Sequence, residues 1–556
     1  MKRIACLLLF SSLFTIAAAD DDKDQHHHED LTAAQLGTVS FPVSCAPSAQ
    51  KRFERGVALL HSFWYEEAEK EFQQIAKDDP HCAMAHWGVA MSLWHQLWNH
   101  PDAKTVKRGL AETQSARATI GLRMVESSLQ APIPGHSKEV LDHELAYISA
   151  MLHFYGDSKK LNHEARAKAY SDAMKKVYET YPDDHEGAAF YALSLLACEP
   201  HEDATFANRK QAAAILEKLF AIEPDHPGVA HYLIHSYDKP QLAQLGLPAA
   251  RRYAQIAPAA PHALHMPSHI FARVGLWQDD INSNLASIAA TRKTAAMHMS
   301  GEGHQFHAMA FLFYAYMQSG RDPDAKALIE EIRAMPDRHD DMYGKGFDPH
   351  ASALAHLSAL YPIEMHDWPT AAALPPTEVA GTAEYSLTCW ARAIGSAHLR
   401  KPDDVRKEVA AIESLHKRLV REKSEFADAV EDDRKAAQAW LAFAEGKVDD
   451  AVEALRPIAD KEDSVGDEPE GTPAREMIAD MLLGAQRPQQ ALAEYQTDLK
   501  LYPNRFDGLY GAARAAEAAG KQDQAAHYYA QLVKNCEGSS SERPELSRAK
   551  ELLAKK

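Results

Sequence analysis

The segment GVALLHSFWYEEAEKEFQQIAKDDPHCAMAHWGVA, residues 56–90, contains the spacing that decides the fold. Small residues stand at Gly56 and Ala68, a large residue at Phe72 and a proline at Pro80. Small residues allow two helices to approach closely, and a large residue fills the interface between them. A proline ends the second helix because it lacks a backbone N–H. The segment therefore predicts a helix-turn-helix hairpin.

The same spacing returns further along the chain. It is carried by Gly88 at the start of the next unit, by Ala212, Leu216 and Pro224, and by Ala491, Tyr495 and Pro503 followed by Gly511. This pattern resembles the 34-residue tetratricopeptide repeat (TPR) family over most of the mature length, in degenerate copies. The stretches HALHMPSHIF (262–271) and PNRFDGLYGAARAAE (503–517) are similar to a group of exported bacterial TPR proteins of unsettled function.

The resemblance implies an all-α fold, a right-handed α-solenoid of TPR-like helix-turn-helix repeats that could be divided into two segments. The expected divisions are a signal peptide (1–19), an acidic, His-containing flexible N-terminus (20–48), an N-terminal TPR-like solenoid with the His-rich helices (49–361), a Pro-rich connection (362–382), a C-terminal TPR-like solenoid (383–536) and a polar C-terminal tail (537–556).

The N-terminal residues predict export. A basic start, Met1 to Arg3, precedes the apolar run IACLLLFSSLFTI (4–16) and the small residues 17–19, which is the pattern of a secretory signal peptide. No later apolar run approaches the ~18–20 residues that a membrane span needs. We therefore expect an exported protein, periplasmic or extracellular, with no transmembrane segment after signal cleavage. In an oxidising compartment a disulfide between Cys45 and Cys82 is plausible.

Charge excludes one class of partner. The formal net charge of −19 leaves no basic surplus to neutralise phosphates, so we expect no nucleic-acid binding. The Arg and Lys residues are scattered along the chain.

Two histidine pairs stand out among the 30 histidines. His231 and His235 are four residues apart, as are His265 and His269, and the pairs are one 34-residue period apart. A pair at i, i+4 lies on one helix face, and equivalent helices of adjacent repeats pack side by side. The spacing therefore predicts that four imidazoles face one space.

Further candidate ligands surround these pairs in the sequence. They are His262 one turn earlier, Asp238 at a helix end, and the pair His304 and His307 on the next helix. Three or four such ligands suit Zn, Cu, Ni or Fe as a divalent transition metal. Tyr232 and Met266 stand where a zincin protease carries its glutamate, so the sequence does not predict a zincin protease.

A structural interpretation competes with the metal site. The paired histidines occupy positions where the TPR pattern has packing residues, so they could be buried side chains hydrogen-bonded to their neighbours.

The leading functional hypothesis is an exported TPR-repeat scaffold without catalysis of its own. It would bind a protein or peptide partner on the concave solenoid face and could hold a histidine-rich metal site in the middle repeats. The alternatives are a metal-dependent enzyme and a metal storage or delivery protein, both using the paired HxxxH histidines.

Overall fold

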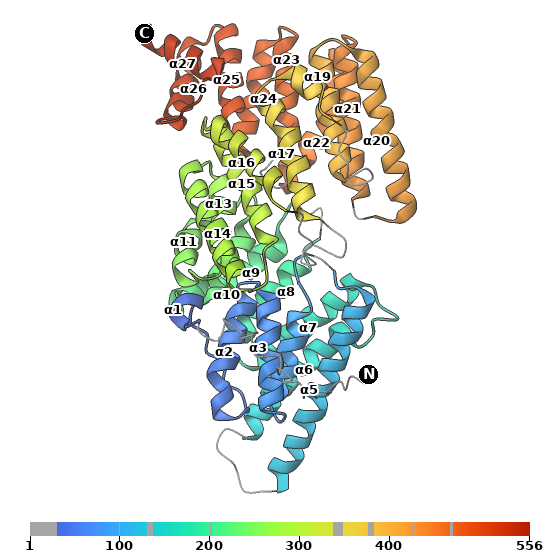
Figure 1. The fold of residues 1–556 in the computed structure, drawn as a ribbon, viewed down its shortest axis with the longest axis vertical. Coiled ribbons are helices and arrows are strands. Elements are labelled where there is room, and N and C mark those ends of the chain that lie inside the picture. The colour runs from blue at the N-terminus through green and yellow to red at the C-terminus, as the bar shows by residue number, and fades with distance from the viewer. Residues whose placement is uncertain are drawn as a thin grey trace, which may run out of the picture.

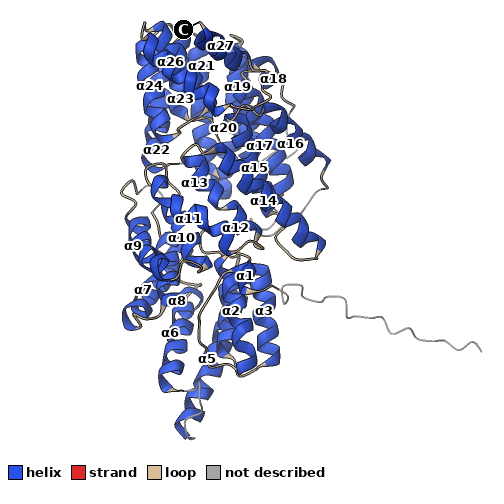
Figure 2. Cartoon of the chain, turned by 90° about the vertical axis from the view of Figure 1, so that its left-hand side faces the viewer, coloured by secondary structure: helices blue, strands red, loops and turns tan. Residues whose placement is uncertain are grey.

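The computed structural model describes residues 31–98, 100–129, 137–200, 203–336, 348–375, 383–424, 426–466 and 471–555. These residues form helices joined by loops and turns, and they contain no strand (Figure 2). The expected all-α solenoid is therefore confirmed. The expected signal peptide, residues 1–19, lies outside the described residues.

The helices follow one another in three groups along the chain. The first is α1 (Ala33–Leu36), α2 (Pro47–His61), α3 (Tyr65–Asp78), α4 (Ala83–Ser92), α5 (Ala103–Leu129), α6 (Lys138–Tyr155), α7 (His163–Thr180), α8 (His185–Ala197) and α9 (Ala207–Ile222). The second is α10 (Pro227–Tyr237), α11 (Ala243–Ile256), α12 (Pro261–His265), α13 (Pro267–Arg273), α14 (Trp277–Ala296), α15 (His304–Gln318) and α16 (Asp322–Ala334). The third is α17 (Pro349–Glu364), α18 (Trp368–Ala372), α19 (Ala383–His398), α20 (Pro402–Glu422), α21 (Ala427–Ala444), α22 (Val448–Val465), α23 (Ala474–Gly484), α24 (Pro488–Leu501), α25 (Phe506–Ala518), α26 (Gln522–Asn535) and α27 (Pro544–Ala554).

Most consecutive helices pack against each other, and the three groups succeed one another along the long axis (Figure 1). The N-terminal helices occupy one end, the green helices α10 to α16 the middle and the C-terminal helices the other end. Two apolar cores result. One is built from residues 36–271 with Met299, and the other from residues 272–549. The Pro-rich connection expected at 362–382 begins inside α17 and includes α18, whose Ala371 is buried in the second core.

The repeat spacing read from the sequence matches the packing. A Cβ placed on Gly56 would lie 2.7 Å from Cζ of Phe72, and one on Gly88 would overlap the same ring. The Phe72 side chain therefore fills the space between α2 and α4 that the two glycines leave. Tyr495 packs in the same way against Gly511. α3, α9 and α24 each end two residues before a proline.

The N-terminal segment differs from the expectation of flexibility over residues 20–48. Residues 31–48 pack on the solenoid: Phe41 is buried beside Trp87 and Tyr147, and the Thr38 N–H donates to the Asp225 carbonyl at 3.0 Å. Apolar side chains such as Phe41 hold this stretch in place, although its composition is polar further upstream. Residues 20–30 lie outside the described part of the chain.

A disulfide joins Cys45 to Cys82. It links the segment before α2 to the residue that precedes α4.

The C-terminal end also contains packed structure. The expected polar tail, 537–556, includes α27, whose Leu546 and Ala549 are buried. Just before it, the buried guanidinium of Arg543 donates to an Asp507 carboxylate oxygen at 2.6 Å. No helix among the described residues is both long enough and apolar enough to cross a membrane.

The third group of helices contacts the second. The Trp277 indole N–H donates to the Asn504 carbonyl at 2.9 Å, and the Asn535 amide donates to the Gln318 carbonyl at 2.9 Å. Nearer the middle of the chain, the Lys239 ammonium donates to the Gly466 carbonyl at 2.9 Å. The end of α22 therefore lies beside the end of α10.

Candidate metal centre

The predicted site residues lie on four helices. α10 carries His231 and His235, and α15 begins at His304. Between them the chain forms two short helices rather than one, because α13 starts at Pro267, which has no N–H to continue α12. His262 and His265 therefore belong to α12 and His269 to α13.

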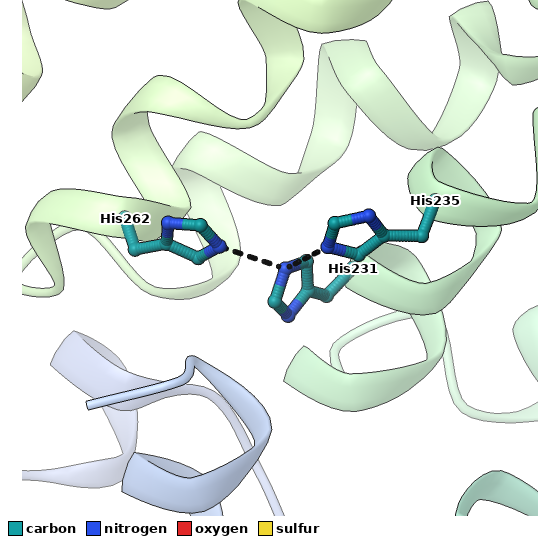
Figure 3. A group of neighbouring side chains, drawn as sticks. All are labelled: His231, His235 and His262. Carbon is teal, nitrogen blue, oxygen red and sulfur yellow. Dashed lines mark hydrogen bonds between the residues drawn. The ribbon is translucent and has the colours of Figure 1, made fainter. Parts of the chain in front are cut away.

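The first histidine group consists of His231, His235 and His262, whose ring nitrogens converge (Figure 3). The Nε2 atoms of His235 and His262 each lie 3.1 Å from Nε2 of His231. All three ligand atoms lie within 4.8 Å of one another. The i, i+4 pair of α10 thus takes its third member from α12, in the next hairpin.

The second histidine group consists of His265, His269 and His307. Nε2 of His265 lies 3.0 Å from Nε2 of His269, and one ring nitrogen of each residue lies within 4.8 Å of the others. This group repeats the design of the first, because an i, i+4 pair is again completed by a histidine from the next hairpin, here on α15. The expectation of four imidazoles in one space is corrected to two groups of three.

Hydrogen bonds fix the tautomers in the second group. Nδ1 of His265 donates to Oδ1 of Asn284 at 2.7 Å, and the Asn284 amide is oriented by donating to Asp280 at 2.6 Å. Nδ1 of His269 donates to a carboxylate oxygen of Asp238 at 2.9 Å. When both imidazoles are neutral, each carries its one N–H on Nδ1, and the Nε2 atoms of His265 and His269 then present lone pairs that face each other.

In the first group, a hydrogen bond fixes the tautomer of one of the three rings. Nδ1 of His231 donates to the backbone carbonyl of His61 at 2.6 Å, so its Nε2 presents a lone pair to the other two rings. Nδ1 of His262 is buried and makes no hydrogen bond among the described residues. The second group is therefore the more fully oriented of the two.

Burial favours the neutral form of five of the six imidazoles. Removal from water lowers the pKa of His231 to about 3 and that of His307 to about 3. Burial and the neighbouring histidines hold the pKa values of His235, His262 and His265 well below the usual range. At neutral pH these five rings are in the form that binds metals.

A phenylalanine covers each group. The Phe63 ring centroid lies 4.3 Å from that of His231 and 5.6 Å from those of His235 and His262. Phe311 lies 4.5–5.2 Å from the three rings of the second group. Each ring cluster is thereby shielded on one side by an apolar side chain.

Two predicted ligands lie beside the groups rather than within them. One oxygen of Asp238 accepts from His269, and the other accepts from Nε of Arg273 at 3.0 Å. Burial opposes ionisation of Asp238, but Arg273 and His269 outweigh it and hold the pKa of this carboxyl well below its usual range. Asp238 orients a histidine, as carboxylates do around metal sites. His304 lies with its ring centroid 5.2 Å from that of His262 and belongs to neither group.

Two other clusters bring potential ligands together but are chemically satisfied. Glu186 accepts from Nε2 of His61 at 2.7 Å and from Nε2 of His226 at 2.9 Å. The remaining nitrogen of His61 accepts from Tyr232, and that of His226 accepts from the Val229 N–H. In the cluster of Cys45, Asp79 and Cys82, the sulfurs form the disulfide.

A pocket of about 810 Å³ opens onto both histidine groups. His235 and His262 of the first group line it, as do His269 and His307 of the second. Its volume falls in the range of small-molecule sites. The pocket wall also includes Trp98 and Phe206, which are apolar, and Lys239.

Sequence reasoning missed the residues that orient and cover the rings. Asn284 and Phe311 lie within α14 and α15, Phe63 lies in the turn between α2 and α3, and the His61 contribution is a backbone carbonyl. No local signal marks them, because each acts across a helix interface.

The comparisons with known proteins give only distant likenesses. The sequence matches no family model and no curated protein. Among solved structures, the human IFIT1 dimer with m7Gppp-AAAA shares 13% identity, covers 81% of this chain and 90% of its own, and gives a TM-score of 0.31. The APC/C hetero-tetramer Cut9–Hcn1 shares 13% identity over 84% of this chain and 76% of its own, with a TM-score of 0.32.

The TPR domain of P58(IPK) shares 14% identity over 67% of this chain and 99% of its own, with a TM-score of 0.20. Likenesses this distant carry no argument about function. The repeat assignment rests on the helix packing described above.

Proposed function

We propose that this protein binds a divalent transition-metal ion at each histidine group, with a remaining coordination position directed at the pocket. The observation that carries the proposal is the pair of Nε2 lone pairs of His265 and His269, 3.0 Å apart. Their Nδ1 protons are held by Asn284 and Asp238. Two lone pairs at this separation repel unless a cation lies between them.

A metal ion suits this gap better than a proton. Histidine nitrogens bind zinc at about 2.0–2.1 Å, so two ligands of a tetrahedral ion lie about 3.3 Å apart. The observed spacing is close to that value. A bridging proton would create an imidazolium, which burial disfavours at His265.

The kind and number of the ligands restrict which metal ions can bind. Each group offers three imidazoles, which suit Zn, Cu, Ni or Fe. Three protein ligands and an open position are typical of catalytic metal sites, whereas structural sites fill every position. The pocket beside both groups thus favours the metal-dependent enzyme among the alternatives considered from the sequence.

The proposal also includes export of the protein and binding of a protein or peptide partner. The basic–apolar–small pattern of residues 1–19 and the Cys45–Cys82 disulfide support an oxidising compartment, periplasmic or extracellular. The stacked hairpins also suit a scaffold that binds a protein or peptide on its concave face. A pull-down from the exporting cell with the mature chain tests that role, and recovery of the chain alone would contradict it.

Metal titration tests the metal proposal. The metal-free protein should bind two zinc ions per chain, measured by elemental analysis after dialysis. The double variants His231→Ala/His235→Ala and His265→Ala/His269→Ala should each bind one, because each removes a single group. His153→Ala, at an exposed position on α6, is the matched control and should bind two. A wild-type protein that retains no metal would overturn the proposal.

A further inference from the structure

The lining of the pocket beside the histidine groups includes the lysine Lys239. Lys239 follows directly after Asp238 at the end of α10, and its ammonium donates to the Gly466 carbonyl. Lys239 makes no ion pair with a described carboxylate. A backbone carbonyl leaves the full charge of the ammonium and two of its three donors for another group.

The acidic residues of the pocket are already engaged within the protein. Both oxygens of Glu199 accept from Nε of Arg209, at 2.6 and 2.7 Å. Asp203 accepts from the backbone N–H groups of Thr205 and Ala207 at the start of α9. Asp238 is held by His269 and Arg273, as described above.

Two other charged side chains of the pocket lining are paired as well. Glu164 is exposed and accepts from the Asn162 amide at 3.1 Å, and Lys168 donates to Asp172 at 2.5 Å. The pocket lining carries three cationic side chains (Lys168, Arg209 and Lys239) against four carboxylates (Glu164, Glu199, Asp203 and Asp238), so the proposed metal ions would supply the positive charge that attracts an anion.

We propose that this pocket binds a small organic anion, with its carboxylate or phosphate oxygens between Lys239 and the metal ions of the two histidine groups. This inference rests on the proposed function. Trp98, Leu97 and Phe206 supply apolar surface for the carbon skeleton of the ligand. A charge-assisted hydrogen bond from a partly buried ammonium is strong and selects for an anionic oxygen.

Burial lowers the pKa of Lys239, and Arg209 and Arg273 lower it further, whereas Glu199 and Asp238 oppose the shift. An anion at the ammonium would reverse this effect and raise the pKa of Lys239.

Calorimetric titration of the zinc-loaded full chain tests the inference. The probes are inorganic phosphate, succinate and phenyl phosphate, and the probe that binds most tightly identifies the oxyanion class and the use of the apolar wall. Lys239→Gln should weaken binding of that probe by about tenfold, because it removes one charge-assisted contact. Lys168→Gln, which also lines the pocket but is paired with Asp172, should change the affinity less than about twofold.

Zinc content measured on the same samples separates the two proposals. Two zinc ions without anion binding, or equal affinities of Lys239→Gln and wild type, would overturn the anion site and leave the metal proposal standing. Anion binding that depends on Lys239 in a chain that retains no zinc would overturn the metal proposal alone. Retention of zinc by Lys239→Gln shows that the variant is folded.

Discussion

At the scale of single residues, the site depends on which nitrogen of each histidine carries the proton. The Nδ1 proton of His265 is held by an amide oxygen, and that of His269 by a carboxylate oxygen. Their facing lone pairs form a gap that an ion can occupy without rearrangement.

Asp238 should control the second group alone. In the variant Asp238→Asn the acceptor for His269 Nδ1–H is uncharged and Arg273 loses its counter-ion. We expect zinc affinity at the second group to fall about 10–100-fold, the usual effect of losing an orienting partner. Competition with a chelator measures both affinities. An equal loss at the first group would show that Asp238 acts on the whole fold.

The buried histidines should make metal-free stability depend on pH. His231 has an unfolded pKa near 6.5 and a folded pKa of about 3, so the unfolded chain binds the extra proton below 6.5. Stability is therefore complete above pH 6.5 and falls as the pH drops from 6.5 toward 3. Between pH 7 and pH 5 this ring alone should remove about 2 kcal/mol of unfolding free energy.

Urea unfolding at the two pH values measures the change. The His231→Gln variant should show a smaller difference between them, and a difference equal to that of wild type would contradict the assignment.

At the scale of elements, the sequence spacing predicted the hairpin packing well. Phe72 between Gly56 and Gly88 follows from the requirement that small and large residues face each other across an interface. Only two of the three rings in each histidine group could be predicted from the sequence. The i, i+4 pairs are visible within one helix, but the third ring of each group depends on how adjacent hairpins stack and on the break at Pro267.

Gly88→Ala should disturb one hairpin interface. The added methyl group would overlap the Phe72 ring, and overpacking of this kind removes about 1–3 kcal/mol of stability. Gly121→Ala on α5 is the control, because a Cβ there meets no atom within 4 Å, and it should be stabilising by about 0.5–1 kcal/mol. Chemical denaturation measures both, and a neutral Gly88→Ala would contradict the packing.

At the scale of the molecule, the composition of the two terminal segments did not predict that they pack on the solenoid. Composition predicted a flexible N-terminus over residues 20–48 and a polar tail over residues 537–556, yet Phe41 and Leu546 are buried. A few apolar residues are enough to pack a polar segment against the rest of the protein. The average composition of the segment does not reveal these residues. The contact of Lys239 with Gly466 was equally invisible, because it joins segments 227 residues apart.

The disulfide should stabilise the N-terminal end of the molecule. Replacing both Cys45 and Cys82 by Ser removes a cross-link over 37 residues and should remove about 2–4 kcal/mol from the unfolding free energy. Cys198→Ser, at a cysteine that forms no disulfide, is the control. Equal stability of the double variant and the wild type under oxidising conditions would contradict the cross-link.

The central claim is that each histidine group binds a metal ion, and anomalous X-ray diffraction from zinc-soaked crystals of the full chain tests it most directly. Data collected at the zinc edge should show one peak among His231, His235 and His262 and a second among His265, His269 and His307. The absence of both peaks, or occupancy of the His61–Glu186–His226 cluster instead, would contradict the account.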